Sequence, residues 1–167
     1  MDEDECAGCT QGVDAAREQQ AAMIRDHGFM FQAVGGGEGT PGFVYTIGLA
    51  QRGLPEFIFV GSCQRPAVGY LEGAIDAAMA GTEIVPGLVP PETGINPYQV
   101  PAWVLTASDK LDTHAFGVRR QLEIAGKPDT ATLLQIVMPD MSGRFPWEPG
   151  YDWVDQQIEA APPSGRA

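Results

Sequence analysis

The sequence predicts one α+β domain with a mostly antiparallel central sheet of about five strands and two to three helices packed on it. Two observations support this fold class. Short segments rich in β-branched and aromatic residues follow one another with brief turns between them, and such turns favour antiparallel pairing. Other, longer segments carry apolar residues at helical spacing. The chain has 167 residues, which is enough to bury a single core.

One helix and three strands are predicted in the first half of the chain. Asp14 is a suitable N-cap and Gly28 a suitable terminator for a helix over residues 14–27, in which Met23, Ile24 and several alanines supply an apolar face. The next three apolar segments are short and rich in Val, Ile, Phe and Tyr, as is typical of strands. They span residues 29–34, 43–49 and 56–60.

Two helices and two strands are predicted in the second half. Pro66 suits the first turn of a helix that ends near Ala80, and a further helix is expected over about residues 108–125. Five prolines make residues 82–101 a long loop in this interpretation. We expect the two better helices to cover one face of the sheet. The strands are expected at residues 103–106 and 132–138.

Two tails are expected to flank the domain. Residues 1–12 are predicted to be a flexible acidic tail, residues 13–155 to form the single domain, and residues 156–167 to be disordered. No run of 18 apolar residues occurs, and the acidic start of the chain lacks the apolar stretch of a secretory signal. Three cysteines are too few for a disulfide framework, so we expect a cytoplasmic protein.

The formal net charge of −12 restricts the classes of partner. Nucleic acids and anionic membranes attract basic surfaces, so we expect neither as a partner. A basic protein partner is compatible with this charge, and so is a role in solubility alone. Because the acidic residues beyond Glu5 are scattered, the pattern favours solubility.

Cys6 and Cys9 are the candidate metal ligands, because two thiols at this spacing can bind one zinc ion. A structural zinc site needs four ligands, and only the fold could bring His27, Cys63 or His114 to this pair. The acidic residues that precede Cys6 oppose a redox role, because they disfavour a thiolate. His27 and His114 are also the candidate catalytic residues. The alternatives are a favourable interaction with the helix dipole for His27 and a surface position for His114.

Two segments contain polar and aromatic residues that are unusual in a pure core. The first is Tyr45-Thr46-Ile47-Gly48, where a glycine within a strand indicates a bulge or a close backbone approach. The second spans residues 135–151 and ends in a stiff aromatic and proline-rich stretch. If strand pairing joins the segments, Arg144 is the anion-binding group of a shared site; the alternative is core packing. The predicted ligand-binding residues are Tyr45, Thr46, Gln135, Arg144, Phe145 and Trp147.

Four landmarks occur in order: Cys6-x-x-Cys9; Asp26-His27-Gly28-Phe29; Phe43-Val44-Tyr45-Thr46-Ile47-Gly48-Leu49 followed by Leu54-Pro55-Glu56; and Gln135-Ile136-Val137-Met138-Pro139-Asp140 with Gly143-Arg144-Phe145-Pro146-Trp147. With these landmarks the chain resembles the bacterial DUF4262 domain family over nearly its whole length. Phe29 stands where a tryptophan is common in that family, and Met138 where an aromatic residue is common. The resemblance implies a single cytosolic domain. It does not imply that the protein catalyses any particular reaction.

The sequence therefore favours a non-catalytic domain that binds a small molecule or a peptide. The first alternative is a metal-assisted, zinc-dependent hydrolytic enzyme that uses His27 or His114 with Cys6 and Cys9. The second alternative is an acidic protein-interaction module. No motif in the chain compels a particular reaction, ligand or oligomeric state.

Overall fold

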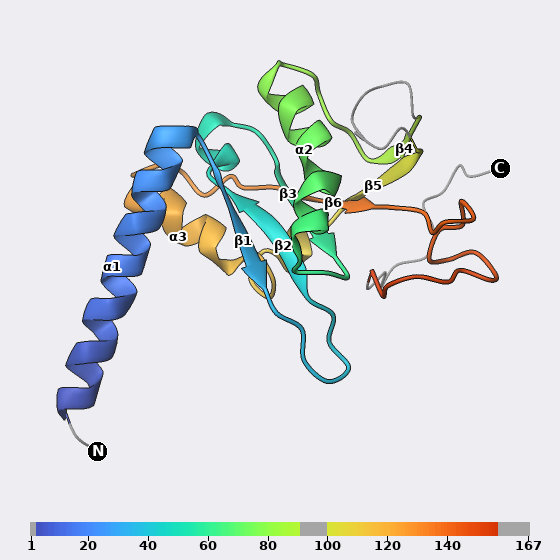
Figure 1. Ribbon diagram of the computed structural model, residues 1–167. Helices are drawn as coiled ribbons and strands as arrows, with labels where there is room; N and C mark the ends of the chain where they lie inside the picture. The colour runs from blue at the N-terminus through green and yellow to red at the C-terminus, as the bar shows by residue number, and fades with distance from the viewer. Residues whose placement is uncertain (1–2, 91–99, 157–167) are drawn as a thin grey trace.

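The chain folds into a six-stranded sheet with helices on both of its faces (Figure 1). The computed structural model describes residues 3–90 and 100–156, with side chains from residue 12 onward. This architecture confirms the predicted α+β class and single domain. The helices and strands are α1 (Glu3–His27), β1 (Met30–Val34), β2 (Phe43–Ile47), β3 (Glu56–Val60), α2 (Arg65–Met79), β4 (Gly87–Val89), β5 (Ala102–Thr106), α3 (Phe116–Ile124) and β6 (Leu133–Val137), with the 3₁₀ helices η1 (Leu49–Arg52) and η3 (Ser108–Lys110).

The strands lie in the order β1-β2-β3-β6-β5-β4. The neighbouring pairs are antiparallel except β3 and β6, which are parallel, with Glu56 opposite Leu133 and Ile58 opposite Gln135. The sheet is therefore mixed, a small departure from the mostly antiparallel sheet that we predicted. A parallel pair requires a long crossover. Here the chain between β3 and β6, which contains α2, β4, β5, η3 and α3, provides that crossover.

Apolar residues cover both faces of the central strands. Every residue of β2, β3 and β6 is buried, so both faces need a covering layer. Leu71 and Ile75 of α2 pack with Phe57 and Phe59 on one face. Residues of α1 and α3 pack with Tyr45 and Ile58 on the other face. Our expectation that the two better helices share one face is therefore wrong, because α1 and α2 lie on opposite faces (Figure 1).

Helix α1 begins at Glu3, well before the predicted start at Asp14. Most of the expected flexible tail over residues 1–12 is therefore helical in its backbone. Carboxylates in the first turn of a helix interact favourably with the helix dipole, and the sequence places Glu3, Asp4 and Glu5 there. The N-terminal half of α1 extends away from the sheet (Figure 1). Among the residues that the structure describes, no helix combines the length and apolar character needed to cross a bilayer.

Three boundaries in the second half differ from the prediction. The segment 108–125 contains η3 and the short helix α3 instead of one long helix, because residues 111–114 form turns between them. Strand β4 lies inside the predicted proline-rich loop, and its position at the sheet edge tolerates the flanking Pro86 and Pro90. Gln156, which we assigned to the disordered tail, is completely buried. Residues 157–167 lie outside the described part of the chain.

Candidate functional site

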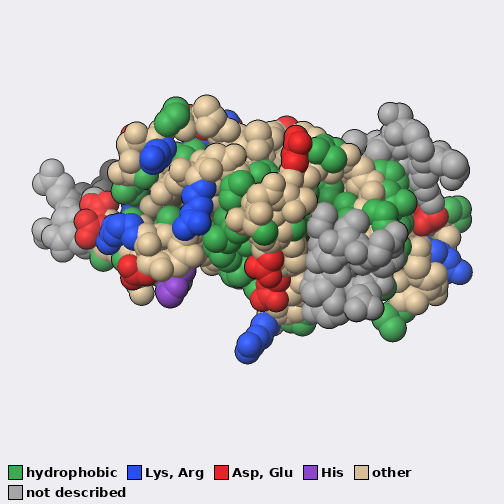
Figure 2. All heavy atoms as spheres, turned by 90° about the horizontal axis from the view of Figure 1, so that it is seen from above, with side chains coloured by type: hydrophobic (Ala, Val, Ile, Leu, Met, Phe, Trp, Pro, Cys, Tyr) green, Lys and Arg blue, Asp and Glu red, His purple; other side chains and the backbone are tan. Residues whose placement is uncertain are grey.

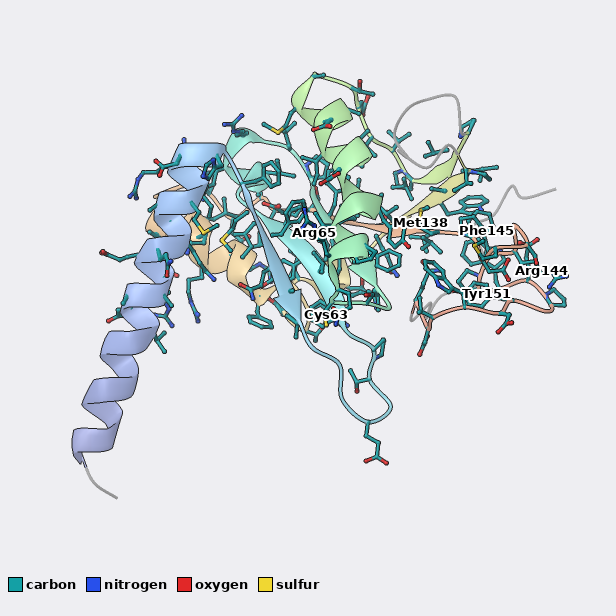
Figure 3. All side chains as sticks on the ribbon, viewed as in Figure 1. Cys63, Arg65, Met138, Arg144, Phe145 and Tyr151 are labelled. Carbon is teal, nitrogen blue, oxygen red and sulfur yellow. The ribbon has the colours of Figure 1, made fainter. Side chains whose placement is uncertain are left out.

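The carboxyl ends of β3 and β6 lie side by side, because these neighbouring strands are parallel. In open sheets, ligands commonly bind beyond the carboxyl ends of parallel strands. Two segments leave this end of the sheet: the turn 61–64, which leads into α2, and the segment 138–156. Figure 3 labels side chains from both, with Cys63 and Arg65 at the start of α2 and Met138, Arg144, Phe145 and Tyr151 after β6.

The segment 138–156 packs directly against the end of β3. Gly61 has a φ of 126°, and a Cβ at this position would lie 2.7 Å from Cγ2 of Val154 and 3.3 Å from the carbonyl oxygen of Asp155. Only glycine fits so close an approach without displacing the segment. The ring of Trp153 also lies 6.0 Å from that of Phe59 in β3 and 5.7 Å from that of Tyr70 in α2.

Asp140 organises the first part of this segment. Its carboxylate accepts hydrogen bonds from the backbone N–H groups of Ser142 (2.8 Å), Arg144 (2.9 Å) and Asp152 (2.9 Å). The hydrogen bond from Arg144 is the main cause that lowers the pKa of Asp140, because it favours the charged carboxylate. One side chain thus joins both ends of the loop over residues 140–152.

Gln156 closes the segment at its other end. Its side-chain amide accepts a hydrogen bond from the N–H of Met138 (2.9 Å) and donates one to the carbonyl of the same residue (2.7 Å). The side chain of Gln135 donates to the backbone carbonyl of Gln156 at 2.7 Å. Gln135 and Gln156 are both buried, so Gln135 holds the loop in place and is not presented to solvent as a ligand-binding group.

The aromatic residues of the segment form one cluster with β5. The rings of Phe145 and Trp147 are stacked, with centroids 5.3 Å apart and planes 7° apart. The ring of Trp103 in β5 meets both edge-on, at 6.5 Å and 5.7 Å. Phe145 is buried and Trp147 is half-buried. The structure therefore brings these two predicted site residues together, and it uses them mainly for packing.

Arg144 lies in the same loop, and its side chain is exposed to solvent. Its Nη1 donates a hydrogen bond of 2.9 Å to the backbone carbonyl of Gly150. A guanidinium has five N–H donors, and within the described residues this is the hydrogen bond that its side chain makes. The remaining donors are therefore available to an anion in solution.

Tyr45 and Thr46 do not lie near Arg144. The hydroxyl of Thr46 contacts Glu56 at the start of β3, whereas Arg144 follows the carboxyl end of β6. Since β3 and β6 are parallel, these two positions are at opposite ends of the sheet. The hydroxyl of Tyr45 accepts a hydrogen bond from the N–H of Gly117 at 3.3 Å, within the core beneath α3. The structure therefore does not form the shared site that the sequence led us to expect.

A family model described as a domain of unknown function, DUF4262, matches residues 23–152, which is most of the chain. The chain belongs to the DUF4262 family. The matched region of this DUF4262 domain contains all six strands, α2, α3 and most of the segment 138–156. No curated protein and no solved structure matches the chain.

Glu56 is a residue of this DUF4262 domain to which sequence reasoning gave no role. Its carboxylate is completely buried, and it accepts hydrogen bonds from the N–H groups of Gly48 (2.8 Å) and Ala50 (2.9 Å) and from the hydroxyl of Thr46 (2.5 Å). Burial raises its pKa to about 7. The sequence feature that could have drawn attention to Glu56 is its position as the one charged residue at the start of an otherwise apolar strand, Phe57-Ile58-Phe59-Val60.

The candidate metal ligands and histidines lie apart, and Cys6 and Cys9 precede the region that the family model matches. Cys6 and Cys9 fall on the first turns of α1, and their side chains are outside the described residues. His27 ends the same helix, about 27 Å of helix rise from Cys9, so His27 does not complete a zinc site with this pair in one chain. His114 is half-buried beside Phe43, with ring centroids 4.8 Å apart, and Cys63 is a half-buried free thiol. Among the described side chains no group of three or more His, Cys, Asp or Glu residues is arranged to hold a metal ion.

Proposed function

We propose that this DUF4262 domain is a non-catalytic binding domain for a small molecule or a peptide with a carboxylate or phosphate group, and that Arg144 binds that group. One observation carries the proposal. The exposed guanidinium of Arg144 projects from a loop whose backbone is fixed by three hydrogen bonds to Asp140. Arginine can bind a planar carboxylate or a phosphate through two parallel hydrogen bonds.

The hydrogen bonds of the loop support a binding role, because a recognition group held in place before the ligand arrives loses less entropy on binding. Asp140 joins residues 142, 144 and 152. The carboxylate of Glu148 accepts a hydrogen bond from the N–H of Phe145 at 2.7 Å, and the carbonyl of Gly150 accepts the bond from Arg144. The loop thus keeps its shape through contacts within itself.

An apolar group of the ligand would find a partner next to Arg144. The side chain of Met141 is fully exposed, at 101% of its reference area. Methionine is flexible and polarizable, so it adapts to varied apolar surfaces. Met141 lies on the same Asp140-centred turn as Arg144, which favours a ligand that combines an anionic group with an apolar one, such as the C-terminal residue of a peptide.

Binding can be tested by recording the amide NMR spectrum of the protein during titration with short N-acetylated peptides that end in leucine or phenylalanine. We expect shift changes at the amides of residues 141–152 when the peptide has a free α-carboxylate, and much smaller changes when its C-terminus is amidated. A phosphorylated peptide with a blocked C-terminus separates the phosphate source of the anion from the carboxylate source.

The variant Arg144→Gln should lose these shift changes while its melting temperature stays close to that of the parent, because the side chain is exposed. The matched control is Arg65→Gln, another exposed arginine at the same end of the sheet, which should behave like the parent. Equal responses to free and amidated peptides, or an undiminished response in Arg144→Gln, would contradict the proposed role of Arg144.

A further inference from the structure

A hollow of about 540 Å³ lies along the outward face of α3. Its size is within the range of small-molecule pockets. Its lining residues come from α3 and from the turn that follows this helix, so it is separate from the loop that holds Arg144. Phe116, Arg120 and Glu123 follow each other at spacings of four and three, which places them on one face of the helix. Arg119 of α3 and Lys127 and Asp129 of the turn also line the hollow.

Phe116 provides an aromatic surface at one end of the hollow. It is the first residue of α3, and 54% of its reference area is exposed. The centroid of its ring lies 6.3 Å from that of Tyr45, with the two planes 60° apart, and the hydroxyl of Tyr45 accepts a hydrogen bond of 3.3 Å from the N–H of Gly117. The buried Tyr45 therefore holds the start of α3 in place while much of the Phe116 side chain stays accessible. A ring that is already fixed loses little freedom when a planar ligand stacks on it.

Arg120 places a positive charge one helical turn from Phe116. Its side chain is exposed. Burial raises the pKa of Tyr45, and the charge of Arg120 partly opposes this shift, so the guanidinium lies close enough to the Tyr45 hydroxyl to act on it. The second cation is Lys127, which lines the same hollow. Within the described part of the chain, Arg120 and Lys127 take part in no ion pair. Both charges are therefore available to an anionic ligand.

The remaining charged groups of the hollow are Arg119, Asp129 and Glu123. Nε of Arg119 lies 3.0 Å from Oδ2 of Asp129, and its Nη1 contacts the carboxylate of Asp112. The hydrogen bonds to Asp112 and Asp129 raise the pKa of Arg119 and hold its guanidinium against the wall, so its charge is already neutralised. Glu123 is exposed, and its carboxylate offers an acceptor for an N–H group of a ligand.

Positive charge is scarce in this protein, and part of it is concentrated here. The chain has 10 Lys and Arg residues against 22 Asp and Glu residues, and three of those 10 line this one hollow. Figure 2 shows basic side chains gathered, together with acidic ones, at the end of the molecule that α1 and α3 form. The carboxylates of Asp112, Asp129 and Glu123 oppose the continuous phosphate backbone of a nucleic acid, which requires a basic surface. The hollow therefore suits a small anion and not a polyanion.

We propose that this hollow binds a small aromatic anion, whose planar ring stacks on Phe116 and whose carboxylate or phosphate group is bound by Arg120, with Lys127 as a second cation. Nucleoside monophosphates and aromatic carboxylic acids share this chemistry. Side chains one helical turn apart are separated by about 6 Å, which a ring and an anionic group joined by a few bonds can span. An N–H or amino group on the ring finds an acceptor in Glu123. The site is additional to the one that we propose for Arg144 and does not depend on it.

Amide NMR spectra of the full-length protein, recorded during titration with adenosine monophosphate or indole acetic acid, test the proposal. We expect shift changes at the amides of residues 116–129 with one or both compounds. Adenosine lacks the anionic group and inorganic phosphate lacks the ring, so each should bind at least about tenfold more weakly than adenosine monophosphate if phosphate is the anion. Tighter binding of indole acetic acid identifies a carboxylate as the anion. Absence of shift changes at these amides with both compounds, or adenosine that binds as tightly as its monophosphate, would overturn the proposal.

Two variants test the roles of the ring and the cation. Arg120→Gln removes the charge and should weaken binding of the tighter compound at least about tenfold. Phe116→Leu keeps an apolar side chain at the start of α3 but removes the flat ring, so it should also weaken binding. The matched control is Arg25→Gln, which changes an exposed arginine of α1 outside this hollow and should bind like the parent. Circular dichroism should show the same helix content for all four proteins.

The same spectra separate the two proposed sites, because shift changes at residues 141–152 report binding near Arg144. Arg144→Gln should remove those changes and leave the changes at residues 116–129 intact. Binding at residues 116–129 that is undiminished in both Arg120→Gln and Phe116→Leu would contradict the aromatic anion site.

Discussion

The hydroxyl of Thr46 donates a 2.5 Å hydrogen bond to the carboxylate of Glu56, and the same hydroxyl accepts a 2.9 Å bond from the N–H of Phe57. Thr46 lies one residue before the end of β2 and Glu56 begins β3, so this pair ties the two strands together beyond their last ladder pair. The carboxylate of Glu56 also accepts hydrogen bonds from the backbone N–H groups of Gly48 and Ala50. These bonds fix the turn that leads into η1.

Glu56 should make the stability of the protein depend on pH. Burial raises the pKa of Glu56 from 4.5 to about 7 in the folded state. A raised pKa means that the stability contributed by this group is fully present below about pH 4.5 and is lost as the pH rises through about 7. Since one pKa unit corresponds to about 1.4 kcal/mol, the loss is on the order of 3 kcal/mol. Denaturant unfolding of the parent and of Glu56→Gln at pH 5 and pH 8 measures it.

The amide of Glu56→Gln resembles the protonated acid, so the variant should match the parent near pH 5 and exceed it in unfolding free energy at pH 8. The comparison cancels the pH dependence of all other carboxylates, which the two proteins share. Glu38→Gln changes an exposed carboxylate and serves as the control. If the unfolding free energies of the parent and of Glu56→Gln change equally between the two pH values, Glu56 is not the source of the pH dependence.

Removal of the Thr46 hydroxyl should destabilise the domain. Thr46→Val keeps the shape of the side chain but leaves the N–H of Phe57 and one carboxylate oxygen of Glu56 without their partner, which costs about 1–3 kcal/mol for each buried polar group left unsatisfied. Thr46→Ser retains the hydroxyl and should lose less stability. Chemical denaturation of the three proteins ranks them, and a Val variant as stable as the Ser variant would argue against the hydrogen-bond role.

Removal of the Asp140 carboxylate should loosen the loop without unfolding the sheet. In Asp140→Ala the N–H groups of residues 142, 144 and 152 lose their acceptor, so their hydrogen exchange should accelerate, while amides of β3 and β6 keep their protection. Asp129→Ala removes an exposed carboxylate that pairs with Arg119 and is the control. Unchanged exchange at all three amides would show that other contacts hold the loop.

Truncation of Trp147 should be costly because its ring packs between Phe145 and Trp103. Emptying a buried aromatic site costs about 3–5 kcal/mol, and the half-buried position of Trp147 places Trp147→Ala near the lower limit, at about 3 kcal/mol. Trp153→Ala, at a ring that is 37% exposed, should cost less. Urea denaturation of both variants provides the comparison. A loss below about 1 kcal/mol for Trp147→Ala would mean that the ring contributes little to packing.

The helices and strands that were predicted well are those whose sequence patterns lie within a few consecutive residues. Residues 56–60 were predicted as a strand from their apolar run and form β3 with the same bounds. Pro66 marked the first turn of α2, which begins at Arg65. Gly48 was predicted to mark a bulge or a close backbone approach, and a Cβ there would lie 2.9 Å from Cα of Phe29. β4 was missed because three residues between prolines carry little strand signal of their own.

The candidate site was harder to predict, because its geometry depends on which strands are neighbours. Thr46 and Arg144 were singled out because they are polar residues in segments otherwise suited to a core, yet nothing local indicates that β6 lies parallel to β3 and carries Arg144 to the far end of the sheet. The aromatic stretch was identified from its prolines, whereas its partner Trp103 comes from β5 and is known only from the fold.

The sequence by itself determined the family, the α+β class and the approximate places of most strands and helices, because short-range propensities and apolar periodicity are properties of neighbouring residues. The tertiary structure alone decided the parallel pair, the placement of α1 and α2 on opposite faces and the environment of Glu56. These features depend on contacts between residues distant in the chain, such as Gln135 with Gln156 and Tyr45 with Gly117. Burial and hydrogen bonding between such distant residues determine how stable these arrangements are. A pattern within a few consecutive residues cannot predict those contacts.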